Sequence, residues 1–311
     1  MNNRSILAAV EPQYEGRDME ISDGKRSFST RWRPVKSVPV ATDCPLIVAL
    51  HGGTYTSTYF DVPGYSLLDR AEALGIPILA IDRPGYGRST PLEPADATHA
   101  RNAELLDSAI GSFWREHGGA SRGVVLIGHS IGGAIATAIA ARQPVWPLLG
   151  LAISGVGLHT MPGDAEAWAQ LPDTPTVDLP SALKVIKMFG APATYDRAAP
   201  EASRIADAPA PRRELIDIVS VWPSQVLEIA GRVTVPVHYR QAAQDNLWIV
   251  NEGEIAGFAA AFIRAPRVDA ALVPQAGHCI DFHRRGASFQ LEQLAFALGC
   301  AVSAGMAGNP D

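Results

Sequence analysis

The sequence has few cysteines, no run of basic residues and no long apolar stretch. Its three cysteines, Cys44, Cys279 and Cys300, are too few and too irregularly spaced for a disulfide framework, and no CxxC pair suggests zinc. A formal net charge of −6 without a Lys/Arg run gives no electrostatic footprint for nucleic acid or an anionic membrane. We therefore expect reduced thiols in a reducing compartment, and neither nucleic acid nor membrane as a partner.

A secretory signal is also missing from the start of the chain. Arg4 is followed by a short apolar stretch that Glu11 and Pro12 end too early for the apolar part of a signal peptide. No window elsewhere approaches the length of a membrane span. These absences predict a cytoplasmic protein, in which residues 1–20 form a polar, irregular arm.

Short, continuous apolar runs recur along the chain, and three of them run into turns that contain glycine. Such runs, rather than alternating ones, are typical of strands buried on both faces of a parallel sheet. A hairpin is expected over 19–40, with its turn at 22–25. The further expected strands are 45–50, 77–81, 123–127, 148–154, 233–239 and 267–273.

Helical stretches lie between these runs, at 65–74, 98–116 and 134–142, and a last one at 286–298 closes the domain before a frayed tail from Ala301. Strands that alternate with helices predict an α/β fold, with a mostly parallel sheet covered by helices on both faces.

Residues 157–231 differ from the rest of the chain. They are rich in proline and alanine, contain amphipathic helical pieces at 181–189 and 213–229, and have no strand-like run. We expect a helical lid here, inserted into a core formed by 1–156 and 232–311. Its larger apolar side chains pack mostly within the lid, and a few line an apolar pocket. They are Met161, Trp168, Met188, Phe189 and Trp222.

The strongest motif runs from Gly128 to Gly133, between an apolar strand and a helix-forming run. Its sequence, GHSIGG, contains the G-x-S-x-G pattern in a strand–turn–helix context. The turn is so tight that side chains on both sides of the serine would clash. It forces Ser130 into a strained backbone conformation that exposes its hydroxyl. The helix that follows directs the backbone N–H of Ile131 toward a developing oxyanion.

With this motif the chain resembles the α/β-hydrolase superfamily over roughly residues 19–298. The resemblance rests on four motifs in the family's order: HGGT from His51, DRPGYGRS from Asp82, the serine turn, and AGH ending at His278. It implies a serine hydrolase with a Ser-His-Asp triad and no metal or organic cofactor. It also implies that the loop after the first core strand supplies a second oxyanion donor, the N–H of Gly53, with Thr54 as its neighbour.

The motif from Asp82 to Ser89 is interpreted as structural support beside the site. Pro84 and the two glycines shape a loop, and a substrate-anchoring role for Arg83 or Arg88 is the less favoured alternative. His51 is likewise interpreted as bracing its loop.

A serine nucleophile needs a base, and His278 follows the last predicted strand where the family keeps its histidine. His129 belongs to the serine turn and His238 lies within a strand, while His283 lies just past the loop and is the fallback. Cys279, beside the histidine, is interpreted as a small packing residue because the nucleophile position holds serine.

The triad acid is expected after the fifth core strand. Asp245 stands where the family places its aspartate, although Gln241-Ala242-Ala243 replaces the expected glycine, so Glu252 and Glu254 stay open as alternatives. The fourth strand ends without a carboxylate, which removes the other common location.

These residues predict hydrolysis of a carboxylic ester or lactone through an acyl-enzyme, with a small apolar molecule as substrate. Carbon–carbon bond hydrolysis, thioester or amide hydrolysis on the same triad, and a non-catalytic ligand-binding role stay open, as does a homodimer. Haloalkane dehalogenases and epoxide hydrolases are disfavoured because they carry aspartate at the position of Ser130.

Overall fold

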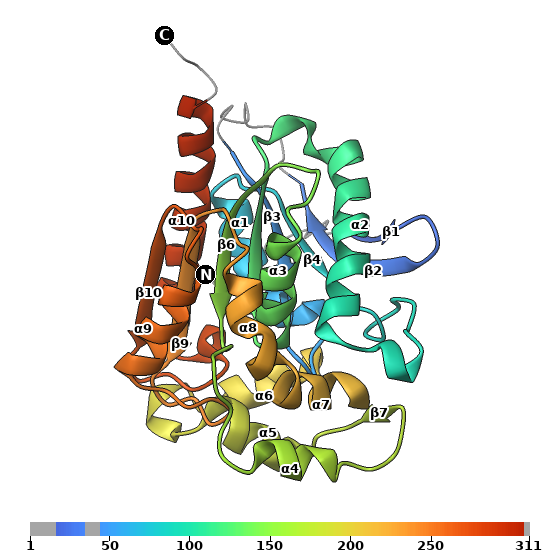
Figure 1. Cartoon of the computed structure of the whole chain (residues 1–311), viewed down its shortest axis with the longest axis vertical. Helices are drawn as coiled ribbons and strands as arrows, with labels where there is room; N and C mark the ends of the chain where they lie inside the picture. Colours follow the sequence, from blue (N-terminus) through green and yellow to red (C-terminus); the bar gives the residue numbers. More distant parts are fainter. Residues whose placement is uncertain (1–16, 35–43, 308–311) are drawn as a thin grey trace, which may run out of the picture.

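A computed structural model describes residues 17–34 and 44–307, and a twisted eight-stranded sheet runs through its centre (Figure 1). The strand order is β1-β2-β4-β3-β5-β6-β9-β10. The first two strands pair antiparallel and β2 runs antiparallel to β4, whereas all other neighbours are parallel. The strands are β1 (Arg17–Ser22), β2 (Ser27–Arg33), β3 (Leu46–Leu50), β4 (Ile78–Ile81), β5 (Val124–His129), β6 (Leu148–Ser154), β9 (Val237–Ala242) and β10 (Val268–Val273).

Helices cover both faces of this sheet, as the alternation of strands and helices predicted. Contacts place α2, α3 and α9 on one face and α1 and α10 on the other. The helices of the described residues are α1 (Leu67–Ala73), α2 (His99–His117), α3 (Ile131–Ala141), α4 (Asp164–Ala169), α5 (Ser181–Lys184), α6 (Ala199–Ser203), α7 (Arg212–Ser220), α8 (Trp222–Ala230), α9 (Glu252–Ala261) and α10 (Gly286–Ala307), with a π-helical turn over Val185–Phe189 and several short 3-10 turns.

The central strand β3 shows why continuous apolar runs form such a sheet. Successive side chains of a strand point to opposite faces. Leu46, Val48 and Leu50 therefore join the core under α2 and α3, whereas Ile47 and Ala49 join the core under α1 and α10. Every residue of β3 is buried, so both faces select apolar side chains.

The carboxyl ends of the parallel strands meet at one edge of the sheet. Leu50 lies opposite Ile81 on one side and Gly128 on the other, and His129 lies opposite Ser154. From β3 the chain passes first to β4 on one side and then to β5 on the other. A crevice at such a reversal of direction is where open α/β sheets bind ligands.

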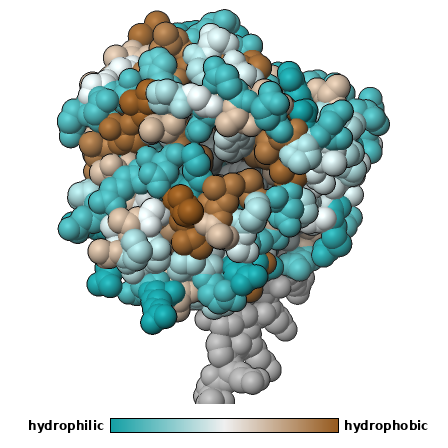
Figure 2. Space-filling model, turned by 90° about the horizontal axis from the view of Figure 1, so that it is seen from below, coloured by the Kyte–Doolittle hydropathy of each residue, from teal (hydrophilic) through white to brown (hydrophobic). Residues whose placement is uncertain are grey.

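The 157–231 segment lies across this carboxyl edge. In Figure 1 its helices α4 to α7 gather at the lower end of the sheet, and Figure 2 looks onto that end, where hydrophobic patches and hydrophilic residues together border a hollow. The last helix, α8, packs against α3 and α9 beside the sheet. No helix of the described ranges is both long and apolar enough to cross a membrane.

Several predicted boundaries were wrong. The fifth core strand begins at Val237 rather than at residue 233, because Pro236 has no N–H to pair, and it extends to Ala242. The predicted helix 213–229 is two helices that break between Ser220 and Trp222. The final helix continues to Ala307, past the expected frayed end at Ala301.

The ends of the predicted hairpin and the predicted absence of strands also need correction. Strand β1 starts at Arg17, inside the arm that was expected to be irregular, and positions 35–40 of the predicted hairpin fall outside the described residues. The 157–231 segment contains one short antiparallel pair, β7 (Thr176–Val177) with β8 (Ala210–Pro211). Helix α9 was not predicted at all.

Candidate active site

The turn between β5 and α3 holds Ser130 in a backbone conformation that residues with a side chain rarely adopt. Its φ is 54° and its ψ is −125°. Glycine is required on both sides, because a Cβ at Gly128 would lie 2.6 Å from the carbonyl oxygen of Gly132, and one at Gly132 would lie 2.1 Å from that of Leu50. The strained, glycine-flanked turn expected from the sequence is present.

Ser130 caps the N-terminus of α3. Its carbonyl oxygen accepts hydrogen bonds from the N–H groups of Gly133 (2.8 Å) and Ala134 (3.1 Å), while its own N–H donates to the carbonyl oxygen of Ser154 at 2.8 Å. The N–H of Ile131, the first residue of the helix, has no acceptor within the helix and lies at the positive end of the helix dipole. The local environment therefore favours negative charge beside the serine.

His278 and Asp245 form a buried hydrogen-bonded pair. The imidazole Nδ1 lies 2.7 Å from Asp245 Oδ2, and the two side chains are 1% and 0% exposed. Because the carboxylate accepts from Nδ1, the Nε2 atom carries the basic lone pair. Nε2 is buried and has no hydrogen-bond partner among the described residues. The His278 ring lies against Gly155, next in sequence to Ser154, whose carbonyl oxygen binds Ser130.

Asp245 is held by two further hydrogen bonds. Its Oδ2 accepts from the Gln241 amide at 2.9 Å, and its Oδ1 accepts from the N–H of Leu247 at 2.8 Å. The alternative acids lie elsewhere, because Glu252 and Glu254 begin α9 and Glu254 contacts His159 at 2.9 Å. Among the carboxylates considered from the sequence, only Asp245 contacts the histidine in the structure.

The loop that carries His278 packs against the π-helical turn of the 157–231 segment. The N–H of Cys279 donates to the carbonyl oxygen of Met188 at 2.9 Å. A Cβ on Gly277 would lie 2.2 Å from the carbonyl oxygen of Phe189, so only glycine fits before the histidine. The side chain of Cys279 is fully buried, and burial raises the pKa of its thiol, which keeps it protonated.

Burial also keeps the neighbouring histidines neutral. His129 stacks on Tyr59, with ring centroids 4.8 Å apart, and its ring lies 4.9 Å from that of His278. Desolvation lowers the pKa of His129 and of His51 well below the usual value. A neutral His129 places no positive charge beside the His278 ring.

His283, the fallback base, supports the His278 loop instead of facing Asp245. Its ring nitrogen Nε2 lies 3.1 Å from the N–H of Gly277, and its Nδ1 lies 3.0 Å from the Thr194 hydroxyl. Burial lowers the pKa of His283 to about 4. These contacts join the His278 loop to Thr194 of the 157–231 segment.

The loop after β3 lies against the serine turn. A Cβ on Gly52 would lie 3.0 Å from Ser130 Cβ, and one on Gly53 would lie 2.9 Å from the Ile131 side chain. The N–H of Thr54 donates to the Tyr86 hydroxyl at 3.3 Å, and Thr54 itself has a φ of 64°. Arg83 is fully buried and donates to the carbonyl oxygens of His51 and Gly52, at 2.8 and 3.1 Å. It therefore supports the loop, as the sequence favoured.

A mostly apolar pocket is lined by Ser130 and adjoins a second cavity that shares six of its lining residues. Trp168 and Met188, two of the five large side chains noted in the sequence, line it, whereas Phe189 and Trp222 are buried in the core and Met161 is partly exposed. No Lys, Arg or His is among the described residues that line the first pocket. They are Gly53, Thr54, Ser130, Ile131, Thr160, Asp164, Trp168, Leu179, Met188, Leu215, Ile218, Val219, Leu247 and Trp248.

Comparison with known proteins identifies the class to which this fold and site belong. The model of the alpha/beta hydrolase family matches residues 47–288, most of the chain. The chain belongs to the α/β-hydrolase family and is a hydrolase of that family.

Individual relatives are more distant. Protein phosphatase methylesterase 1 of Pongo abelii is 29% identical over 139 residues, which are 45% of this chain and 33% of the relative, so the chain matches only about a third of that protein's length. A thermophilic esterase from Thermogutta terrifontis superposes with a TM-score of 0.65 at 17% identity, covering 90% of this chain and 99% of the esterase. The N-acyl homoserine lactonase AidH gives 0.64 at 16% identity, covering 92% and 97%.

Several residues that shape the site were not predicted from the sequence. Gln241 was noted only as a departure from the family pattern, yet its amide holds Asp245. Glu214, Lys184 and Asp164 received no role, although the first two contact groups in and beside the loop after β3 and the third lines the pocket. All three lie far in sequence from the motifs, so no local pattern connects them with the site.

Acid should destabilise the fold through His283. Its pKa rises from about 4 in the folded protein to about 6.5 when unfolded, so the unfolded chain binds the extra proton and stability falls as the pH drops below 6.5. This histidine alone should cost about 2 kcal/mol between pH 7.5 and pH 5. Urea unfolding at both pH values should give a smaller loss for His283→Asn than for the wild type, by about that amount. Equal losses would contradict the assignment.

Proposed function

We propose that the protein hydrolyses a carboxylic ester or lactone through an acyl-enzyme on Ser130. The observation that carries the proposal is the buried His278–Asp245 pair, whose imidazole Nε2 has no partner among the described residues. The His278 ring packs against Gly155, beside the residue that binds the N–H of the strained Ser130. An unassisted serine hydroxyl is a weak nucleophile at neutral pH, and an adjacent base activates it. The family membership and the esterase and lactonase folds it resembles support the same chemistry.

In the proposed mechanism His278 acts first as base and then as acid. Its Nε2 takes the proton of Ser130 as the hydroxyl attacks the carbonyl carbon, and it returns that proton to the leaving alcohol. Asp245 keeps the other ring nitrogen protonated and stabilises the imidazolium. Water, activated by the same nitrogen, then cleaves the acyl-enzyme and frees the acid.

The oxyanion hole is assigned to the backbone N–H groups of Ile131 and Gly53. Ile131 begins α3 and has an unpaired helical N–H, and Gly53 lets the main chain approach the substrate closely. Thr54, the neighbouring candidate, is disfavoured because its N–H already donates to Tyr86.

The pocket favours a neutral substrate with an apolar portion. Its walls are largely aliphatic and aromatic, and none of the described side chains that line it is basic and could bind an acidic acyl group. Its one carboxylate, Asp164, lies 3.5 Å from the ammonium of Lys187, which lines the adjoining cavity. In this proposal the 157–231 segment is the lid that supplies most of those walls, and the substrate is a small molecule rather than a nucleic acid or a membrane surface.

Replacing the nucleophile tests the reaction. With p-nitrophenyl hexanoate, hexanoyl thioester and γ-lactone substrates, Ser130→Ala should lower kcat by roughly 1000-fold or more on every substrate that the wild type hydrolyses. Ser220→Ala, an exposed serine on α7, serves as the matched control and should retain wild-type kcat. Turnover by Ser130→Ala at the control rate would refute the mechanism, and binding without turnover by the wild type would favour the ligand-binding alternative.

Replacing the acid tests the triad. Asp245→Asn keeps the shape of the side chain but favours the wrong imidazole tautomer, so kcat should fall by roughly 1000-fold or more with little change in KM. Glu254→Gln, with the same loss of charge at a site that contacts His159, should leave kcat within about twofold of wild type. A larger loss of kcat in Glu254→Gln than in Asp245→Asn would instead assign the triad acid to Glu254 on α9.

A further inference from the structure

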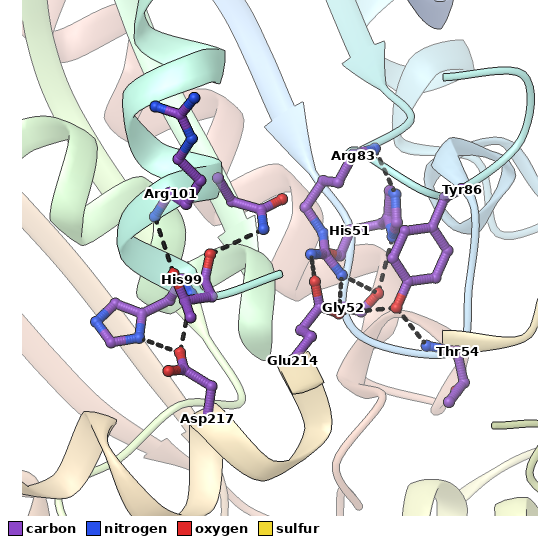
Figure 3. Close-up of polar contacts among 11 residues, drawn as sticks. His51, Gly52, Thr54, Arg83, Tyr86, His99, Arg101, Glu214 and Asp217 are labelled. Atoms are coloured by element: carbon purple, nitrogen blue, oxygen red, sulfur yellow. Dashed lines mark hydrogen bonds and ion pairs between the residues drawn. The ribbon is translucent and has the colours of Figure 1, made fainter. Parts of the chain in front are cut away.

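The loop that carries Gly53 is held on both sides by charged groups whose partners belong to the 157–231 segment. Arg83 follows β4 and lies fully buried beneath the loop. Its Nε donates to the carbonyl oxygen of His51 at 2.8 Å and its Nη2 to that of Gly52 at 3.1 Å, so its guanidinium fixes two successive peptide units. Figure 3 shows Arg83 between these carbonyls and Glu214.

Glu214 on α7 is the counter-ion of Arg83. Both terminal guanidinium nitrogens, Nη1 and Nη2, contact its carboxylate, with Nη2 at 2.9 Å from Oε1, and the glutamate is 1% exposed. The same Oε1 accepts a hydrogen bond from the Tyr86 hydroxyl at 2.8 Å, and that hydroxyl in turn accepts from the N–H of Thr54 (Figure 3). A buried guanidinium without a counter-ion would be strongly unfavourable, so the position of Arg83 depends on the glutamate of α7.

Lys184 holds the other end of the loop. It ends α5, is 5% exposed, and its ammonium donates to the carbonyl oxygen of Thr54 at 2.7 Å. The same ammonium contacts the Asp207 carboxylate and lies 4.0 Å from the centre of the Tyr55 ring. The peptide units of residues 51–54 are thus bound from two directions, through α5 and through α7.

The same helix α7 forms a wall of the substrate pocket. Leu215, adjacent to Glu214, lines the pocket together with Ile218 and Val219, and its side chain would lie 3.4 Å from a Cβ on Gly53. An oxyanion donor works only when it is preorganised about 2.7–3.1 Å from the developing charge. A small displacement of such a donor lowers the reaction rate strongly.

We propose that Glu214 and Lys184 are positioning residues, which set the oxyanion loop through Arg83, Tyr86 and Thr54. The 157–231 segment then does more than cover the pocket, because the oxyanion hole has its working geometry only while Glu214 and Lys184 keep their contacts around the loop. This inference rests on the proposed function and extends it: a segment expected to select the substrate also controls the rate of the chemical step.

The helix α7 offers a matched control. Asp217 lies about one turn beyond Glu214 and is also buried, but it contacts the N–H and the Nδ1 of His99, at 2.9 and 2.5 Å, at the start of α2 (Figure 3). Asp217→Asn therefore removes a buried charge that docks the same helix without contacting the oxyanion loop. Tyr86→Phe is a milder second variant, since it removes only the hydroxyl that joins Thr54 to Glu214.

The test compares turnover with the binding of a transition-state analogue. An alkyl trifluoromethyl ketone adds to Ser130 and places its oxyanion in the hole. Glu214→Gln should lower kcat for p-nitrophenyl hexanoate about 10- to 100-fold with KM unchanged, and weaken ketone binding by the same factor. Tyr86→Phe should lower kcat and ketone affinity about 10-fold each. Asp217→Asn should be less stable than the wild type, but its kcat and its ketone affinity should stay within about twofold of the wild-type values.

Two results would overturn the inference. In the first, Glu214→Gln and Tyr86→Phe have the same kcat and the same ketone affinity as Asp217→Asn. The other is a loss of kcat with ketone affinity unchanged, which would mean that the oxyanion geometry is intact. Should Glu214→Gln fail to fold, Tyr86→Phe alone decides between these outcomes. A wild-type protein that binds no ketone at all would instead contradict the proposed function.

Discussion

The backbone turn at Ser130 constrains the rest of this site. A positive φ at a residue with a side chain is costly, and it persists only where surrounding contacts fix the chain. Here the carbonyl oxygen of Leu50 lies so close to Gly132 that no Cβ fits, and this packs the end of β3 directly against the serine turn. The loop after β3, the N-terminus of α3 and the serine are consequently parts of one junction between two neighbouring strands.

Around that junction, buried charges are matched by partners from distant parts of the chain. Asp245 holds His278, Glu214 holds Arg83, and Asp217 holds His99. Burying charged groups contributes little net stability compared with apolar packing, but removing the partner of a buried carboxylate leaves its charge uncompensated. Such pairs therefore act as fixed docking points. One orients the proposed base, and the other two join α7 to the loop after β4 and to the start of α2.

The sequence was informative where one segment determines its own structure. Continuous apolar runs located the core strands, and the G-x-S-x-G pattern predicted the strained turn because the pattern and its strand–turn–helix context lie within one stretch of the chain. Prediction was poorer where distant residues decide the outcome. Gln241 belongs to the three residues that replace the glycine expected from the family resemblance, yet its amide reaches Asp245, a contact visible only once the strand end is folded. Glu214 looked like an ordinary polar residue of an amphipathic helix, since its partners Arg83 and Tyr86 come from the distant loop after β4.

The proposed mechanism depends on a covalent bond that forms at the hydroxyl of Ser130. The most direct test is mass spectrometry of protein quenched in acid during turnover of p-nitrophenyl hexanoate, followed by peptide mapping. The account predicts a hexanoyl group on the peptide that contains Ser130 in the wild type, and none in Ser130→Ala. A hexanoyl group on Cys279 or elsewhere, or steady turnover with no acylated peptide at any quench time, would contradict it.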